Sequence, residues 1–124
     1  METKVLIAED DYFFRQLLSN LFNDYGCRIR AVDRGDDCMA ALFQERIDLA
    51  VVDYHLPGMK GDVIISTARK YDITVPIIII TADNSLGIEQ AVRKHGPAYF
   101  LVKPFNMKDL GAIYRKITAI PKAF

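Results

Sequence analysis

Residues 75–81 read VPIIIIT, and this stretch does most to decide the fold of the 124-residue chain. An apolar run without polar interruptions indicates a strand that is buried on both faces, as in a parallel sheet with helices on each side. Pro76 is compatible with this interpretation, because the first residues of a strand tolerate a missing hydrogen-bond donor. The run ends at the polar residue Thr81.

Segments of the same kind lie on both sides of this run. Further strands are predicted at residues 5–8, 27–32, 48–52 and 98–102, of which 27–32 is more polar and suits an edge. Helices are predicted at residues 11–25, 35–46, 60–71, 86–95 and 106–118. Five alternating strand–helix units predict an α/β fold, a doubly wound five-stranded parallel sheet with right-handed crossovers. We expect one domain over residues 1–124. The spacing of the predicted strands and helices does not by itself fix the order of the strands in the sheet.

Details of the helices follow from periodicity and end signals. The first helix has apolar residues at positions 14, 17, 18, 21 and 25, and the third has a predicted inner face at positions 63, 64, 67 and 68. Gly26 is expected to close the first helix as the residue after its cap. Asn106 is expected to cap the start of the last helix.

Composition and charge exclude several classes of protein. The chain is 51% hydrophobic, and its 16 basic and 16 acidic residues give a formal net charge of zero, which argues against a nucleic-acid module. No run is long enough for a transmembrane helix, and residues 1–4 lead straight into a strand, so neither a membrane span nor a signal peptide is expected. Cys27 and Cys38 lack a metal-binding spacing and fit reduced thiols in a cytoplasmic protein.

Polar side chains stand at the end of four predicted strands: Glu9 with Asp10, Asp53, Thr81 and Lys103. In open α/β sheets, the carboxyl ends of the strands border the crevice where ligands bind. If these ends converge, acids that suit Mg²⁺ meet an aspartate able to react, a hydroxyl and an ammonium.

Each residue of this set also has a purely structural interpretation. The acidic pair could cap a helix, and Asp53 could start the turn at residues 54–58. Thr81 could be a helix cap, and Lys103 could extend along the surface into water. Each structural interpretation is reasonable for a single site. Together they do not explain why all four sites fall at the ends of predicted strands.

At this point the chain resembles the receiver domain of two-component response regulators, of the chemotaxis-regulator type. The resemblance rests on four ordered motifs: residues 5–11 (VLIAEDD), 53–61 (DYHLPGMKG), 80–82 (ITA) and 102–105 (VKPF). It covers essentially the whole chain and implies a flavodoxin-like (βα)5 fold with strand order 2-1-3-4-5. Glu9 stands where many relatives have aspartate, and we expect that it still serves Mg²⁺.

The resemblance implies a phosphorelay function. Asp53 would accept a phosphoryl group from a phosphohistidine on a sensor histidine kinase or a His-phosphotransfer protein. Glu9, Asp10, Asp53 and the backbone carbonyl of His55 would hold Mg²⁺, and Lys103 would bond the phosphoryl oxygens. The chain would then be no enzyme in the ordinary sense, since it would catalyse only its own phosphorylation and dephosphorylation.

The resemblance also implies a switch. Thr81 would move to the phosphoryl group and let the aromatic ring of Phe100 rotate inward, with packing as the driving force because this ring has no hydroxyl. The last helix, the fifth strand and the helix before it are the expected docking face for a downstream protein, and a homodimer could form through the same face.

Three further residues near the expected site have hypothetical roles in its function. His55 and Asp83, each two residues after a site residue, would border the water that hydrolyses the acyl phosphate, and His55 could set its lifetime near neutral pH. Phe13 lies off the inner stripe of the first helix and is a docking candidate for a partner helix. The plainer alternatives are an exposed loop histidine and an aromatic ring folded back on its own helix.

Two other functions compete with this interpretation. A phosphohydrolase with an aspartate nucleophile generally has a second acid two residues later, where this chain has His55, and 124 residues leave no room for a substrate cap. A receiver-like module that works without phosphorylation is disfavoured because the acids, Thr81 and Lys103 are all retained. No DNA-binding or enzymatic domain is expected after Thr118, and the sequence leaves open whether the chain stands alone or belongs to a longer regulator or hybrid kinase.

Overall fold

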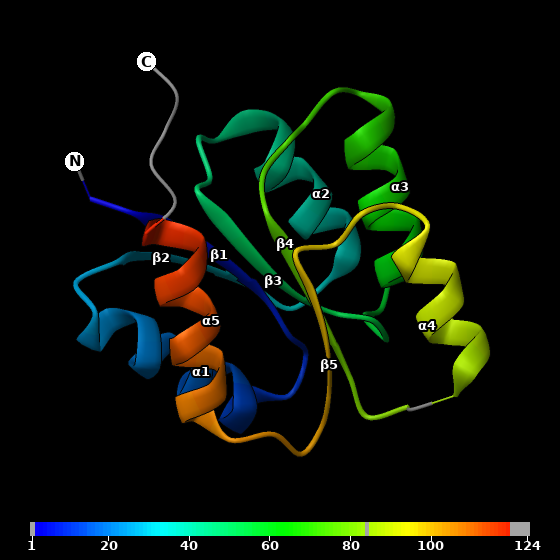
Figure 1. Cartoon of the computed structure of the whole chain (residues 1–124). Coiled ribbons are helices and arrows are strands. Elements are labelled where there is room, and N and C mark those ends of the chain that lie inside the picture. Colours follow the sequence, from blue (N-terminus) through cyan, green and yellow to red (C-terminus); the bar gives the residue numbers. More distant parts are fainter. Residues whose placement is uncertain (1, 84, 120–124) are drawn as a thin grey trace.

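The computed structural model describes residues 2–83 and 85–119, and a parallel five-stranded sheet lies at its centre (Figure 1). The strands are β1 (Lys4–Ala8), β2 (Arg28–Val32), β3 (Leu49–Asp53), β4 (Ile77–Thr81) and β5 (Tyr99–Val102). Their order is β2-β1-β3-β4-β5, so the expected order is confirmed and β2 is an edge strand as predicted.

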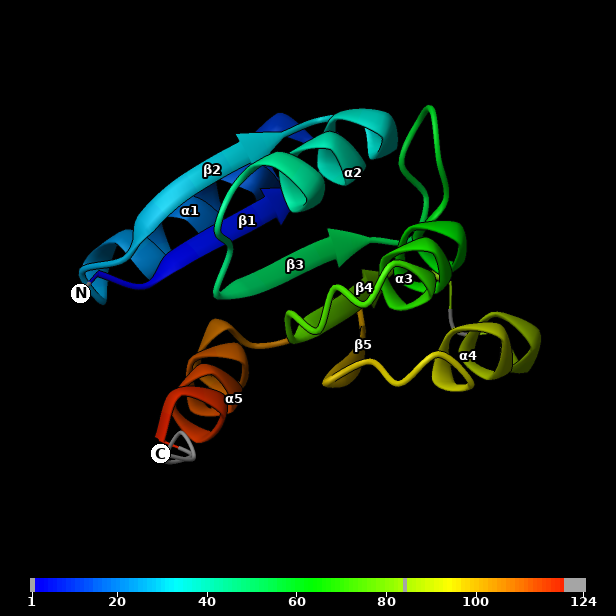
Figure 2. The ribbon, with the colours of Figure 1, turned by 90° about the horizontal axis from the view of Figure 1, so that it is seen from above.

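Helices cover both faces of the sheet, as Figure 2 shows from above. They are α1 (Tyr12–Asp24), α2 (Gly35–Gln44), α3 (Gly61–Lys70), α4 (Leu86–Arg93) and α5 (Met107–Ala119). Buried residues of α1 and α5 share one hydrophobic cluster, and those of α2, α3 and α4 share the other. None of the described helices is long and apolar enough to cross a membrane.

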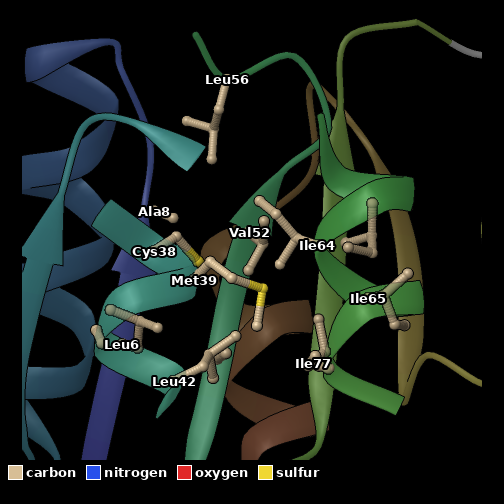
Figure 3. Packing of buried hydrophobic residues seen from close by; sticks show 14 of the residues in the cluster. Leu6, Ala8, Cys38, Met39, Leu42, Val52, Leu56, Ile64, Ile65 and Ile77 are labelled. Atoms are coloured by element: carbon tan, nitrogen blue, oxygen red, sulfur yellow. The ribbon is translucent and has the colours of Figure 1, made fainter. Parts of the chain in front are cut away.

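Strand β4 explains why the core has two halves. All five of its residues are buried, and successive side chains point to opposite faces. Ile77 and Ile79 pack beneath α2 and α3, whereas Ile78 and Ile80 pack beneath α1 and α5. Figure 3 shows the first of these clusters, with Ile77 and Val52 from the sheet close to side chains of α2 and α3. Each fully buried isoleucine contributes about 1.5–3 kcal/mol relative to exposure.

The strand register brings the polar strand ends to one edge of the sheet. Ala8 pairs with Val52, so the residues that follow β1 lie level with Asp53. Asp53 in turn pairs with Ile80, and Thr81 pairs with Val102. The convergence expected from the sequence therefore follows directly from parallel pairing in this order.

The inner face of α3 was predicted wrongly at Val63, and the apolar residues that mark α1 in the sequence are not all buried. Leu17 is 53% exposed and Val63 is 46% exposed, whereas Phe22 and Ile65 are buried. On α1 the buried contacts are made four residues apart, at Leu18 and Phe22, which turns Leu17 to the flank of the helix. On α3 the buried pair is Ile64 and Ile65, which leaves Val63 at the margin.

The end signals predicted at Gly26 and Asn106 and the free thiols agree with the structure. Gly26 follows the cap of α1 with φ of 80°, a conformation that glycine adopts without steric cost. The side chain of Asn106 accepts a hydrogen bond of 2.8 Å from the backbone N–H of Lys108, at the start of α5. Cys27 and Cys38 are both free and buried.

Candidate functional site

Three carboxylates gather at the carboxyl edge of the sheet. Glu9 and Asp10 follow β1, Asp53 ends β3, and one oxygen of each lies within 4.8 Å of the others. Glu9 is fully buried and Asp53 is 5% exposed, while Asp10 faces solvent. Repulsion between charges this close disfavours full ionisation unless cations compensate it.

Lys103, which directly follows β5, supplies one such cation. Its Nζ donates hydrogen bonds to Oε1 of Glu9 at 2.5 Å and to Oδ2 of Asp53 at 2.7 Å. The next peptide bond, to Pro104, is cis. Burial of the ammonium would lower its pKa, but the hydrogen bonds and charges of Asp53 and Glu9 outweigh burial and raise the pKa of Lys103.

Glu9 titrates unusually for a glutamate. Burial of its carboxyl raises its pKa to about 7, because the bond from Lys103 only partly offsets desolvation and the nearby charge of Asp53 raises the pKa further. Near neutral pH, the site therefore binds a proton that a cation could displace.

Contacts from the start of α1 fix the backbone around Glu9. Arg15 donates from Nη1 to the Glu9 carbonyl at 2.8 Å, and the N–H of Asp11 donates to Oε2 of Glu9 at 3.2 Å. Asp11 also caps α1, because its Oδ1 accepts from the N–H of Phe14 at 3.0 Å. Neither Arg15 nor Phe14 was singled out as a site residue from the sequence.

The loop after Asp53 is held by hydrogen bonds that backbone N–H groups donate. The N–H of His55 donates to Oδ1 of Asp53 at 2.8 Å, and the N–H of Gly61 donates to the carbonyl of Tyr54 at 2.8 Å. The N–H of Gly35, at the start of α2, donates to the carbonyl of Pro57 at 2.8 Å. These bonds fix the loop that contains the His55 carbonyl expected to bind metal.

Glycine is required where this loop meets α2. A Cβ on Gly35 would lie 2.1 Å from the backbone oxygen of Met59. Gly58 has φ of 89°, and a Cβ there would lie 2.4 Å from Oδ1 of Asp36. The sequence gives no local sign of this contact, because the two segments are far apart in the chain.

Thr81 and Phe100 occupy neighbouring strands. Thr81 is fully buried, and its Oγ1 accepts a hydrogen bond of 3.0 Å from the N–H of Asp83. Phe100 is half-buried, pairs with Ile79 of β4 and packs against the cluster beneath α2 and α3. The guanidinium carbon of Arg93 on α4 lies 5.9 Å from the centre of the Phe100 ring.

The two rim residues face each other. Nε2 of His55 lies 3.8 Å from Oδ2 of Asp83, and both side chains are nearly half exposed. The ring of Tyr54 packs edge-on against the His55 ring, with 4.9 Å between their centres. The two side chains expected at the rim of the site therefore lie next to each other, and their role in hydrolysis stays a prediction.

Phe13 lies on the solvent side of α1. It is 81% exposed, the largest exposed fraction among the large hydrophobic residues described. Its ring also packs edge-on against the half-exposed Tyr12, with 5.5 Å between centres. The exposure predicted for Phe13 is therefore present, together with a contact to its own helix.

The charge balance of the cluster suits a hard divalent cation. Three carboxylates face one ammonium, and oxygen ligands from one or two carboxylates are typical of Mg²⁺ sites. A proton on Glu9 would otherwise have to offset part of this negative charge.

Comparison with known proteins places this arrangement in a family. The family model described as "Response regulator receiver domain" matches residues 5–115. Sporulation initiation phosphotransferase F of Bacillus subtilis is 30% identical over 116 residues, which cover 94% of each chain. Transcription factor SKN7 of Saccharomyces cerevisiae is 33% identical over 109 residues, which are 88% of this chain but only 18% of that protein.

A solved structure of a receiver domain protein has the same fold as this chain. The crystal structure of a CheY-like response regulator receiver domain protein from Methanospirillum hungatei superposes with a TM-score of 0.88 over 96% of each chain, at 23% identity. At that identity the likeness concerns the fold, which is the flavodoxin-like sheet expected from the sequence.

Proposed function

Because the chain belongs to the response regulator receiver domain family, we propose that it is a phosphoacceptor of a two-component phosphorelay and that Asp53 takes the phosphoryl group. The observation that supports this best is the triad in which Lys103 bonds both Asp53 and the buried Glu9. A nucleophilic carboxylate, a fixed ammonium and neighbouring acids are what phosphoryl transfer to an aspartate requires.

The transfer step uses Asp53 as the nucleophile. A carboxylate oxygen of Asp53 forms a bond to the phosphorus of a phosphohistidine, and the phosphorus–nitrogen bond breaks. Its electron pair stays on the imidazole nitrogen of the donor. Lys103 is placed to neutralise charge on the phosphoryl oxygens, because its Nζ already lies 2.7 Å from Asp53.

Mg²⁺ is the proposed cofactor. Glu9, Asp10, Asp53 and the backbone carbonyl of His55 would hold it, and the first three already present oxygens within 4.8 Å of one another. When bound, the ion supplies positive charge that stabilises the equatorial oxygens of the transferring group. The residues of the chain fix where that charge can sit.

The phosphorylated aspartate would be read by a switch. The Thr81 hydroxyl is placed at the end of β4 beside the site, and Phe100 lies one strand away and half-buried. A hydrogen bond from Thr81 to the phosphoryl group would free space for the Phe100 ring and alter the face formed by α4, β5 and α5. A downstream protein, or a second copy of the chain, would bind there.

The partner that delivers the phosphoryl group would be a sensor histidine kinase or a His-phosphotransfer protein, with which this chain would meet in the cytoplasm. Phe13 and Tyr12 form an exposed aromatic pair on α1, near the acidic residues that follow β1. Exposed aromatic rings of this kind are typical anchors in interfaces. Phe13→Ala should slow transfer from a cognate phosphohistidine protein and leave labelling by acetyl phosphate unchanged, and equal slowing of both would contradict this docking role.

The test of the function uses acetyl phosphate, a small phosphoryl donor. Incubation with Mg²⁺ should add the mass of one phosphoryl group to the intact protein, and Asp53→Asn should abolish the adduct. No catalysis on other substrates is proposed. Repeated turnover of a small phosphate ester would favour the phosphohydrolase alternative, and an unlabelled wild-type chain would favour a module that works without phosphorylation.

A further inference from the structure

Phe14 contacts the ammonium of Lys103 from the side of α1. Nζ of Lys103 lies 4.4 Å from the centre of the Phe14 ring, well inside the range of a cation–π interaction. Among the described residues, the same ammonium also contacts the two carboxylates of Glu9 and Asp53. The Lys103 ammonium therefore contacts one uncharged aromatic ring in addition to the two carboxylates.

The Phe14 ring is itself held in place. The backbone N–H of Phe14 donates a hydrogen bond of 3.0 Å to Oδ1 of Asp11, the residue that caps α1. Phe105, two residues after Lys103, packs edge-on against the Phe14 ring with 5.7 Å between centres and 80° between planes. The ring therefore presents a fixed surface to the ammonium.

A fixed surface matters because a lysine side chain is flexible and its carboxylate partners change during the reaction. The four-carbon stem of Lys103 loses rotamer freedom when the ammonium is held. Phosphorylation turns the Asp53 carboxylate into an acyl phosphate, which moves the negative charge that attracts Lys103 from Oδ2 to the phosphoryl oxygens. The face of Phe14 is unchanged by that step and continues to attract the ammonium.

We propose that Phe14 is a positioning residue for phosphorylation of Asp53. Its ring holds the Lys103 ammonium where the incoming phosphoryl oxygens arrive. This proposal rests on the phosphoacceptor function proposed above. It assigns to Phe14 a role separate from the apolar packing that its place on α1 predicts.

The test compares two replacements of Phe14 in the full chain. Phe14→Leu keeps an apolar side chain but removes the π face, and should slow labelling by acetyl phosphate at saturating Mg²⁺ about three- to tenfold. Phe14→Tyr keeps the π face and should label at nearly the wild-type rate. Phe43→Leu is a matched control, because Phe43 is an exposed ring of α2 that contacts Tyr71.

A spectroscopic readout separates positioning from a general loss of structure. The ε-methylene protons of Lys103, observed by NMR with ¹³C-labelled lysine, should be shifted upfield by the ring current of Phe14. Phe14→Leu should remove this shift and Phe14→Tyr should keep it.

The outcomes distinguish the two proposals. Equal labelling rates for Phe14→Leu and the wild type, or equal slowing by the leucine and tyrosine variants, would overturn the role of Phe14 while the phosphoacceptor function stands. Failure of the wild-type chain to accept phosphate would contradict the function itself, and the role of Phe14 would fall with it.

Discussion

Nζ of Lys103 donates a hydrogen bond of 2.7 Å to Oδ2 of Asp53, although 50 positions separate the two residues. The contact forms because β5 and β3 both lie next to β4, so that their carboxyl ends meet at one edge of the sheet. The same ammonium bonds the buried Glu9, which makes Lys103 the cation between two acids.

Removal of this cation should destabilise the protein when Mg²⁺ is absent. Lys103→Met keeps most of the apolar stem but leaves Glu9 and Asp53 without their partner, at a cost on the order of 3 kcal/mol of unfolding free energy. Urea unfolding measures this loss, and added Mg²⁺ should restore part of it. Lys108→Met, at an exposed position of α5, should change stability little. Equal stability of the two variants would contradict the role given to the triad.

Mg²⁺ affinity should rise with pH through neutrality. The pKa of Glu9 is raised to about 7, mainly by burial, so a proton competes with the cation below that pH. Calorimetric titration should give a dissociation constant about tenfold larger at pH 6 than at pH 8, as expected for one competing proton. Glu9→Gln should abolish most of this dependence, and an equally steep dependence in Glu9→Gln would assign it to another group.

The same shift sets the pH dependence of stability in the metal-free protein. Glu9 binds its proton more tightly in the folded state than in the unfolded chain, where its pKa is near 4.5. Stability should therefore fall as the pH rises from about 4.5 to about 7 and should change no further through this group above that range. Urea unfolding of the wild type and of Glu9→Gln at several pH values isolates the contribution.

The contact between α2 and the loop after Asp53 should be needed for the site. Gly35→Ala places a methyl group against the Met59 carbonyl and should cost about 1–3 kcal/mol, because a backbone atom cannot move aside easily. By displacing the loop, it should also weaken Mg²⁺ binding and slow labelling by acetyl phosphate. Gly87→Ala is the control, since nothing lies near a Cβ at that position of α4, and it should stabilise by about 0.5 kcal/mol. A Gly35→Ala protein with normal Mg²⁺ affinity would separate the loop from the metal site.

His55 and Asp83 should influence how long the phosphoryl group lasts. They face each other across 3.8 Å, at the rim where the family resemblance implies that water approaches Asp53. Removal of the imidazole by His55→Ala should change the rate of phosphate loss, because the ring and the Asp83 carboxylate stand together at this rim. The measurement is the decay of the phosphorylated form by intact mass. Equal decay of variant and wild type would leave His55 an ordinary loop residue.

The sequence was sufficient for the strands, the edge position of β2 and the convergence of the polar strand ends. Buried parallel strands are nearly continuous apolar runs, and Thr81 and Asp53 interrupt them where the sheet ends. The strand order did not follow from spacing, because connection lengths of this kind allow more than one order. It came from the four motifs of the resemblance.

The residues that the sequence did not reveal are those whose role depends on contacts between segments distant in the chain. Phe14 fits the apolar stripe of α1, and periodicity cannot tell a core contact from a ring that faces Lys103. Val63 fits the predicted inner face of α3, and Leu17 fits the apolar spacing of α1, because an apolar residue at the margin of a helix stripe has the same spacing as one at its centre. The fit of Gly35 against Met59 joins distant segments and has no local pattern.

Phosphorylation of Asp53 is tested most directly by chemical identification of the modified side chain. Borohydride reduces an acyl phosphate of aspartate to homoserine, which peptide mass spectrometry locates. After incubation with acetyl phosphate and Mg²⁺, homoserine should appear at position 53 and should be absent when Mg²⁺ is chelated. Homoserine at another aspartate, or an adduct that borohydride leaves intact, would contradict the assignment of Asp53 as the phosphoacceptor.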